Sequence, residues 1–132
     1  MDSTSVPDIA GRHRVRLLLQ YGSTVSGRVH AMSDLDIAAL FEDDDDLLAR
    51  VVALGAELQA CFPGQEMDVA AINHADPLFL KKILERCKLL HGSPRALAEL
   101  RMYSFRRYQD HRRFLALEQS YVRRSLQRLA AR

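Results

Sequence analysis

The sequence predicts a small α/β (α+β) domain in which a mixed β-sheet of three to four strands is flanked by helices, with a long helix at the C-terminal end. Short apolar runs that stop at Gly, Pro or acidic residues alternate with segments whose apolar residues recur every three or four positions. Residues 95–132 contain neither Gly nor Pro. The chain has 132 residues, of which 48% are apolar and 27% charged, so we expect one core and a single domain over residues 1–132.

Three segments are predicted as strands. Residues 15–21 (VRLLLQY) are a short apolar run that stops at Gly22, and residues 34–41 (DLDIAALF) begin polar, turn apolar and end at an acidic run. Residues 66–72 (EMDVAAI) follow a Phe-Pro-Gly break and read as the third strand. The residues before the first strand are expected to be poor in helix.

Three segments are predicted as helices. Apolar residues recur at helical spacing over residues 46–61, and the acidic run at residues 43–46 suits the positive end of a helix dipole. Asp76 followed by Pro is a good cap and first turn for a helix to about residue 87. Residues 95–132 keep a broadly helical spacing and predict one long helix or two abutting ones.

The composition excludes several classes of protein. It is too apolar for a disordered chain, and no run of 18 apolar residues or signal-peptide pattern is present, so we expect no membrane contact and a cytoplasmic location. Cys61 and Cys87 have neither disulfide-framework nor zinc-site spacing. We expect them to be buried thiols.

The formal net charge of +2 hides a strong asymmetry along the chain. Residues 1–80 hold 5 basic and 13 acidic side chains, whereas residues 81–132 hold 14 basic and 4 acidic ones. A basic tail with interleaved Tyr and Phe can bind RNA, but such a helix more often packs its aromatic side chains and turns its charges to solvent or a partner. We therefore expect a protein interface, and we do not expect direct nucleic-acid binding.

The most informative stretch is residues 21–41, where Gly22 and Ser23 are followed by ten residues and then by Asp34-Leu35-Asp36. Side chains alternate along a strand, so the two carboxylates lie on one side, roughly 7 Å apart along the chain. They repel each other unless a cation neutralises them. Carboxylate oxygens are the ligands that Mg²⁺ prefers, completed by water and substrate phosphates.

The Gly-Ser pair supplies the second half of a candidate site. Gly22 permits a crowded turn, and the amides that follow, with the Ser23 hydroxyl, can hold a phosphate group. Ser33 could bond a phosphate oxygen or simply start the strand. Asp68 is the acid within the third predicted strand, where burial without a partner would be costly. Solvated turn carboxylates, or a salt bridge from Asp68, are the alternative interpretations.

The Gly-Ser pair, the ten-residue spacing, the Asp-Leu-Asp triplet, Asp68 and residues 72–94 (INHADPLFLKKILERCKLLHGSP) together resemble the minimal nucleotidyltransferase (MNT) domain of the polymerase-β-like superfamily. More narrowly, they resemble the MntA-type antitoxins of HEPN/MNT (type VII) toxin–antitoxin systems. The resemblance covers about residues 15–125. It implies a nucleotidyltransferase fold, Mg²⁺ held by three acids, the triphosphate of ATP held at the Gly-Ser turn, and transfer of AMP to a tyrosine of a HEPN toxin in a heteromeric complex.

These features predict an Mg²⁺- and ATP-dependent protein adenylyltransferase. Asp34, Asp36 and Asp68 are the expected catalytic and metal-binding residues, and Gly22, Ser23 and Ser33 the expected nucleotide-binding residues. Asp34 and Asp36 would bridge the metal ions, and Asp68 could also accept the proton of the attacking hydroxyl. Two alternatives stay open: an antitoxin that acts by occlusion alone, and a nucleotidyltransferase that acts on a small molecule or on RNA.

Overall fold

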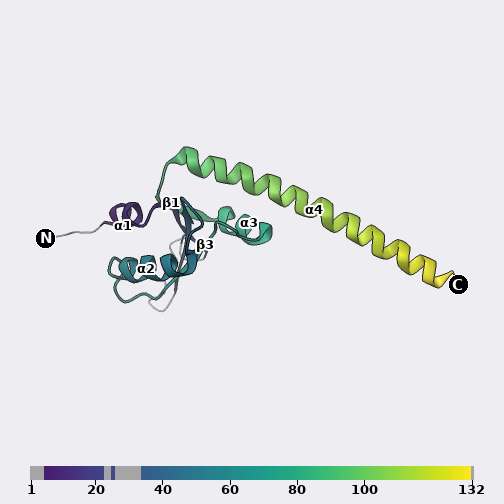
Figure 1. Cartoon of the computed structure of the whole chain (residues 1–132), viewed down its shortest axis with the longest axis horizontal. Helices are drawn as coiled ribbons and strands as arrows, with labels where there is room; N and C mark the ends of the chain where they lie inside the picture. Colours follow the sequence, from purple (N-terminus) through teal and green to yellow (C-terminus); the bar gives the residue numbers. More distant parts are fainter. Residues whose placement is uncertain (1–4, 23–24, 26–33, 132) are drawn as a thin grey trace.

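The computed structural model describes residues 5–22, 25 and 34–131, and Figure 1 shows a sheet domain from which one long helix extends. Within these described residues, four helices and four strands follow one another. Their bounds are α1 (Val6–Arg12), β1 (Val15–Tyr21), β2 (Leu35–Phe41), α2 (Leu47–Gln59), β3 (Met67–Ala71), α3 (Pro77–Glu85), β4 (Cys87–His91) and α4 (Pro94–Ala130). The predicted fold class, a mixed sheet flanked by helices with a long C-terminal helix, is confirmed.

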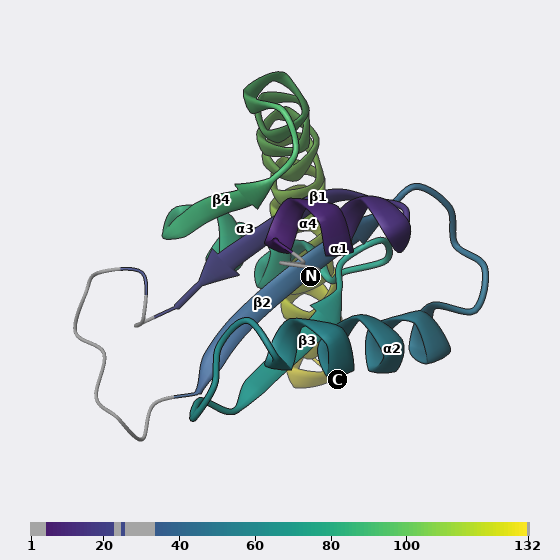
Figure 2. The same ribbon diagram turned by 90° about the vertical axis from the view of Figure 1, so that its left-hand side faces the viewer.

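The four strands form one sheet in the order β3-β2-β1-β4. Strand β1 is antiparallel to both of its neighbours, β2 and β4. Strands β2 and β3 are parallel and are joined through α2, because a parallel pair needs a crossover connection. The end of β1 therefore lies beside the starts of β2 and β4, and β3 starts beside β2 (Figure 2).

Helices cover both faces of the sheet, in three layers. Helices α1 and α2 pack on one face through a cluster made of Ile9, Ala10, Val15, Leu18, Ile37, Ala39, Phe41, Leu54 and Leu58. Helix α3 and the start of α4 pack on the other face through Leu17, Leu19, Ala38, Ile72, Leu80, Ile83, Leu84 and Leu100. Odd- and even-numbered residues of β2 thus face opposite layers, as strand geometry requires.

Two local predictions were wrong. The start of the chain is not poor in helix: α1 begins there, with the Ser5 hydroxyl accepting from the Asp8 N–H and Pro at its first turn. The helix expected to reach residue 87 ends at Glu85, and Cys87–His91 is a strand. The short run CKLLH suits a helix or a strand equally. Its hydrogen-bonded pairing with β1 makes this segment a strand.

The acidic run after β2 does not form the first turn of α2. Asp46 precedes the helix with a φ of 52° and caps it with no side-chain hydrogen bond. Asp43 instead accepts from Arg50 (2.6 Å) and contacts Arg14 (3.1 Å). A bond from the Asp45 N–H and these two arginines lower the pKa of Asp43. Asp43 therefore ties the end of β2 to the α1–β1 connection and to α2.

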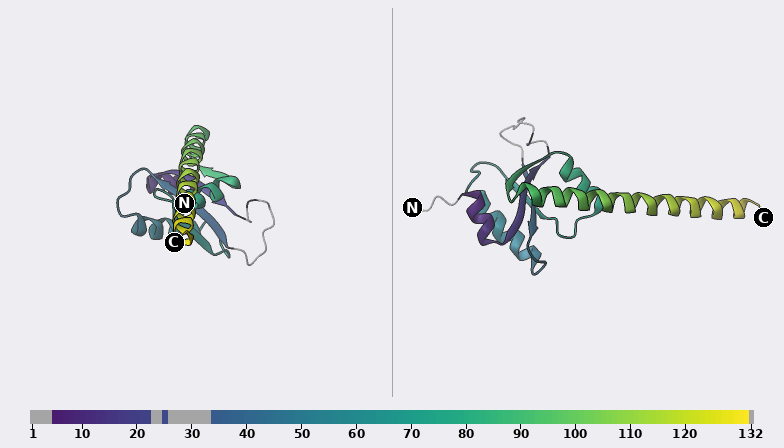
Figure 3. Two further views of the ribbon diagram at one scale, coloured as in Figure 1. Left: turned by 90° about the vertical axis from the view of Figure 1, so that its right-hand side faces the viewer. Right: turned by 90° about the horizontal axis from the view of Figure 1, so that it is seen from above.

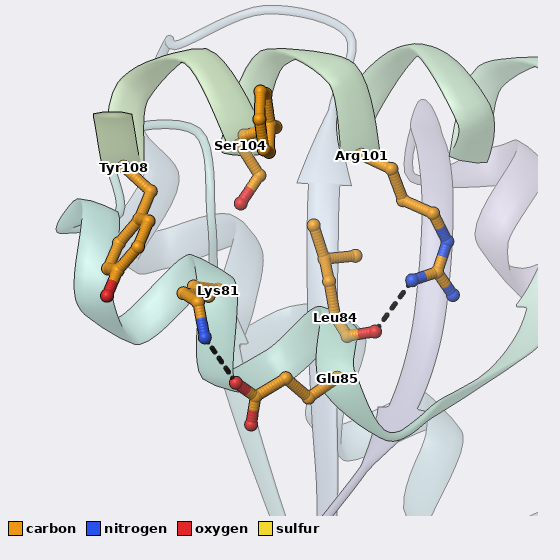
Figure 4. A pocket seen from close by; sticks show the side chains of 7 residues that line it. Lys81, Leu84, Glu85, Arg101, Ser104 and Tyr108 are labelled. Carbon is orange, nitrogen blue, oxygen red and sulfur yellow. Dashed lines mark hydrogen bonds and ion pairs between the residues drawn. The ribbon is translucent and has the colours of Figure 1, made fainter. Parts of the chain in front are cut away.

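Helix α4 is attached to α3 over its first four turns (Figure 4). The Arg101 guanidinium donates to the Leu84 carbonyl oxygen at 2.7 Å. Lys81 pairs with Glu85 at 2.6 Å, and its ammonium lies 4.9 Å from the centre of the Tyr108 ring. These contacts hold α3 against the start of α4.

Beyond this attachment α4 extends away from the domain, as two views at right angles show (Figures 1 and 3). Its 37 residues correspond to a length of about 55 Å. The buried residues of α4 are Leu100 and Ser104. In the part of the chain that the structure describes, no helix combines the length and the apolar character needed to cross a membrane.

Both cysteines are half-buried, and no disulfide joins Cys61 to Cys87. The prediction that no disulfide joins them is confirmed for these two residues. They are less deeply buried than expected.

Candidate active site

The Asp-Leu-Asp triplet lies at the start of β2, where strand geometry separates its side chains. Leu35 and Ile37 are buried, with 3% and 0% of their surface exposed. Asp34 is exposed just before the strand, and Asp36 is half-buried within it. Because side chains alternate, both carboxylates are on the side of Ala38, which packs in the α3 layer. They therefore face α3 rather than α2.

Asp68 is the register partner of Asp36 in the adjoining parallel strand β3. Adjacent strands lie about 4.8 Å apart, so the two acids are neighbours across the sheet. The Leu35 N–H donates to the Glu66 carbonyl oxygen (2.8 Å), which aligns the starts of the two strands. Asp68 is exposed rather than buried, because β3 is the edge strand and Asp68 is next to its first residue. The prediction of a costly burial was therefore wrong, while its position beside Asp36 is as expected.

The carboxylates influence one another electrostatically. Burial raises the pKa of Asp36, and the negative charges of Asp68 and Asp34 raise it further. Tyr21 is the register partner of Asp36 on the other side, in β1. Burial raises the pKa of Tyr21 as well, with additional contributions from Asp36 and Asp68. The protein therefore concentrates negative charge at one end of the sheet.

Gly22 follows directly at the end of β1, against Asp36. Its φ is +84°, a conformation that favours glycine, and a Cβ built there would lie 2.8 Å from Oδ2 of Asp36. The Val25 N–H donates to the Gly22 carbonyl oxygen at 3.3 Å. Gly22 thus lets the chain turn in contact with the carboxylate. Ser23 and Ser33, the other predicted nucleotide-binding residues, lie outside the described residues.

Replacing Gly22 by Ala is expected to lower both stability and activity. The left-handed backbone costs an alanine about 1–2 kcal/mol, and the added methyl group would displace the Asp36 carboxylate. Gly64→Ala is the matched control, because Gly64 has a φ of +83° with nothing near its Cβ position. Urea unfolding and nucleotide-transfer assays of the two variants check this. Equal transfer by both would contradict the role of the Gly22–Asp36 contact.

A pocket of about 600 Å³ opens over this end of the sheet. It is lined by Tyr21, Gly22, Asp36, Phe79, Lys82, Glu85 and Arg86. Gly22 and Asp36 belong to the predicted site. Sequence reasoning did not assign Tyr21 to it, nor the other four residues, which come from α3 and its C-terminal end. Their helical spacing was visible, yet no local signal shows which side of a helix lies over a sheet end.

The residues present fit Mg²⁺ by the chemistry of their donors. Asp36 and Asp68 offer only carboxylate oxygens, and their mutual repulsion is relieved by a cation between them. Among the described residues, no three His, Cys, Asp or Glu side chains are gathered so as to hold a metal ion by themselves. The three predicted metal-binding acids, Asp34, Asp36 and Asp68, therefore do not enclose a metal ion by themselves, and a bound Mg²⁺ would complete its shell with water and phosphate oxygens.

A mixed sheet with paired acids beside a glycine turn defines a protein of the nucleotidyltransferase class. Residues 6–95 match the protein family described as polymerase beta, nucleotidyltransferase. The chain therefore belongs to the polymerase-β nucleotidyltransferase family, and the resemblance seen in the sequence is confirmed at this level.

Solved toxin–antitoxin structures share the fold. One, a toxin–antitoxin with AMP-PNP, has 20% identity and a TM-score of 0.72 and covers 96% of this chain and 99% of that chain. A MntA–HpeT mutant has 17% identity and a TM-score of 0.71, with the same coverage. A complex of the tri-AMPylated Shewanella oneidensis HEPN toxin with its MNT antitoxin has 18% identity and a TM-score of 0.63, covering 89% and 90%. No curated protein matches the chain.

Proposed function

We propose that this protein is an antitoxin that transfers AMP from ATP to a tyrosine of a cognate HEPN ribonuclease toxin in an Mg²⁺-dependent reaction. The observation that carries the proposal is the position of Asp36, which lies between Asp68 and Tyr21 in register and in contact with the Gly22 turn. The family match makes the chain a nucleotidyltransferase. What we propose is the acceptor of the nucleotide, a tyrosine of the toxin. A cytoplasmic location accords with this use of ATP.

The reaction is an in-line displacement at the α-phosphorus of ATP. The toxin tyrosine oxygen forms the new P–O bond, the bond to the β-phosphate oxygen breaks, and pyrophosphate leaves. Bound Mg²⁺ would lower the pKa of the attacking hydroxyl and neutralise the departing phosphates. Asp34, Asp36 and Asp68 would hold the metal. Asp68, exposed at the sheet edge, would also accept the proton of the hydroxyl.

The structural neighbours support a protein acceptor. One is a complex of a tri-AMPylated HEPN toxin with an MNT antitoxin, and another contains AMP-PNP. The candidate site is open at the edge of the sheet, where an exposed side chain of a second protein can reach Asp68.

The far half of α4 offers a surface for that protein. Tyr108 lines the pocket between α3 and α4, and steps of seven residues from it along the helix reach Leu115, Val122 and Leu129, apolar residues that the domain does not cover. We call Leu115, Val122, Leu126 and Leu129 the distal α4 surface; they are between 39% and 64% exposed. A helix with this stripe uncovered gains little stability by itself, which favours a covering partner.

Charge indicates what covers the distal α4 surface. Residues 109–130 carry five arginines, at positions 112, 113, 123, 124 and 128, against two acids, Asp110 and Glu118. A second copy would bring like charges together, whereas an acidic helical protein would be attracted. We therefore assign the surface to the toxin, in agreement with the interface expected from the sequence.

Co-expression with the HEPN protein encoded nearest to this gene tests the proposed function. Intact-mass spectrometry should show the toxin heavier by whole AMP units, on a tyrosine located by peptide sequencing. Asp68→Asn should remove these steps. Asp45→Asn, which changes an exposed acid beyond the other end of β2, should keep them. An unmodified toxin that is nevertheless neutralised would support occlusion alone. AMP transfer to RNA or to a small molecule, with the toxin unmodified, would show that the acceptor is not the toxin.

A further inference from the structure

Two cations, one in α3 and one at its C-terminal cap, line the same pocket as Asp36. Phe79 and Lys82 are spaced i and i+3 on one face of α3, and Arg86 is the C-cap residue that follows the helix. All three line the pocket that contains Gly22 and Asp36. We call Lys82 and Arg86 the α3 cation pair. The pocket thus has the Asp36 carboxylate on its sheet side. On its helix side it has two positive charges and Glu85, whose charge is paired with Lys81.

Strand pairing fixes this juxtaposition. Tyr21, at the end of β1, pairs with Asp36 in β2 on one side and with Cys87 in β4 on the other. Arg86 immediately precedes Cys87, so the end of α3 is tied to the sheet beside the Gly22 turn. Phe79 contacts the Tyr21 ring edge to face, with the ring centres 6.2 Å apart. Helix α3 cannot turn without breaking these contacts.

The α3 cation pair is little used by the fold: Lys82 makes only the smallest contribution to the lowered pKa of Glu85, which is due chiefly to Lys81. The neighbouring Lys81 is held by Glu85 at 2.6 Å. Among the described residues, no acidic side chain pairs with Lys82 or Arg86 within 4.0 Å, and both are exposed. Other basic residues of the sheet domain, such as Arg14 and Arg50, do have acidic partners. A pair of free cations beside a glycine turn is suited to a polyanion.

We propose that the α3 cation pair binds the β- and γ-phosphates of the nucleotide, opposite the acids. This rests on the proposed function and goes beyond it, because the phosphates were expected only at the Gly-Ser turn. A metal–triphosphate carries its cation and its outer phosphate oxygens on different sides, and the pocket has matching charges on its two sides. After the α-phosphorus bond breaks, the same two cations neutralise the pyrophosphate that leaves. The site therefore selects triphosphates over monophosphates.

Calorimetric titration of the full-length protein with ATP and with AMP, both in Mg²⁺, tests this proposal. Lys82→Ala and Arg86→Ala should each weaken ATP binding about tenfold, and the double variant more than 30-fold, since each removes a charge-assisted bond. AMP binding should change less than threefold. Lys82→Arg should keep most of the ATP affinity, and the slope of log Kd against log salt should fall in the double variant.

Lys88→Ala is the matched control, because Lys88 is an exposed cation of β4 that does not line the pocket. It should bind ATP like the unaltered protein. Double-variant affinity for ATP equal to that of the unaltered protein, or an equal loss for ATP and AMP, would overturn the proposal. Failure here and failure of the proposed function are distinguishable. If the toxin stays unmodified while ATP binding still depends on the α3 cation pair, the proposed acceptor is wrong. The assignment of the α3 cation pair to the nucleotide phosphates is then still supported.

Discussion

Replacing Asp36 by Asn is expected to abolish AMP transfer and, at the same time, to stabilise the metal-free protein. The carboxylate sits between Asp68 and the Gly22 turn, where it can reach a bound cation, and an amide is a far weaker ligand for Mg²⁺. Metal-assisted stabilisation of phosphoryl transfer is worth several kcal/mol, so transfer should fall by about 10²–10⁴-fold. Rates of AMP incorporation into the toxin measure this.

The stability effect has the opposite sign because the acids repel one another. Burial and the charges of Asp68 and Asp34 raise the pKa of Asp36 in the folded protein. A raised pKa contributes stability that is fully present below the unfolded-state pKa and is lost as the pH rises through the folded-state pKa. At neutral pH in EDTA, Asp36→Asn should therefore melt higher than the unaltered protein, on the order of a few degrees.

Thermal unfolding followed by circular dichroism checks both the sign and the cause. The difference in melting temperature should shrink as the pH is lowered through the range in which Asp36 gains its proton. Adding Mg²⁺ should raise the melting temperature of the unaltered protein more than that of Asp36→Asn. Asp45→Asn serves as the control for the loss of one exposed acid. A variant that melts lower than the unaltered protein and still transfers AMP would contradict the assignment of Asp36.

A double change in the distal α4 surface, Leu115→Glu with Val122→Glu, is expected to separate the protein from its toxin without unfolding it. These side chains lie beyond the part of α4 that packs on α3, so the core loses no contact. Two charges placed in an apolar interface should raise the Kd of the complex by about 100-fold or more. Pull-down and calorimetry with the purified toxin measure the loss.

Ala116→Glu is the control, since Ala116 is exposed and lies 100° around the helix from Leu115. It should bind the toxin normally. Sedimentation of the free antitoxin identifies the competing occupant. If the double variant dissociated a homodimer and left toxin binding unchanged, the distal α4 surface would bind a second copy of this chain. The assignment of this surface to the toxin would then be wrong. Loss of toxin binding with an unchanged melting temperature is the expected result.

Much of the sheet could be predicted because its signals are local. The strand at residues 15–21 was predicted with its observed bounds, and the strands around Asp36 and Asp68 were predicted to within one residue at each end. Apolar runs bounded by Gly and acids leave few alternatives. The strand β4 and the short helix α1 were missed because a five-residue apolar run and a seven-residue segment carry too little pattern. The tertiary structure gives these segments their secondary structure: β4 pairs with β1, and α1 packs on it.

The sequence by itself predicted which side chains are candidates for the chemistry, since the glycine at the end of β1 and the alternation of Asp34 and Asp36 are local features of the chain. Only the tertiary structure determined which residues are neighbours of these side chains. Asp68 became a neighbour of Asp36 through parallel strand register, and Lys82 and Arg86 came to face them through the pairing of β4 with β1. Such juxtapositions depend on contacts between residues far apart in the chain, and periodicity within a single segment contains no information about them.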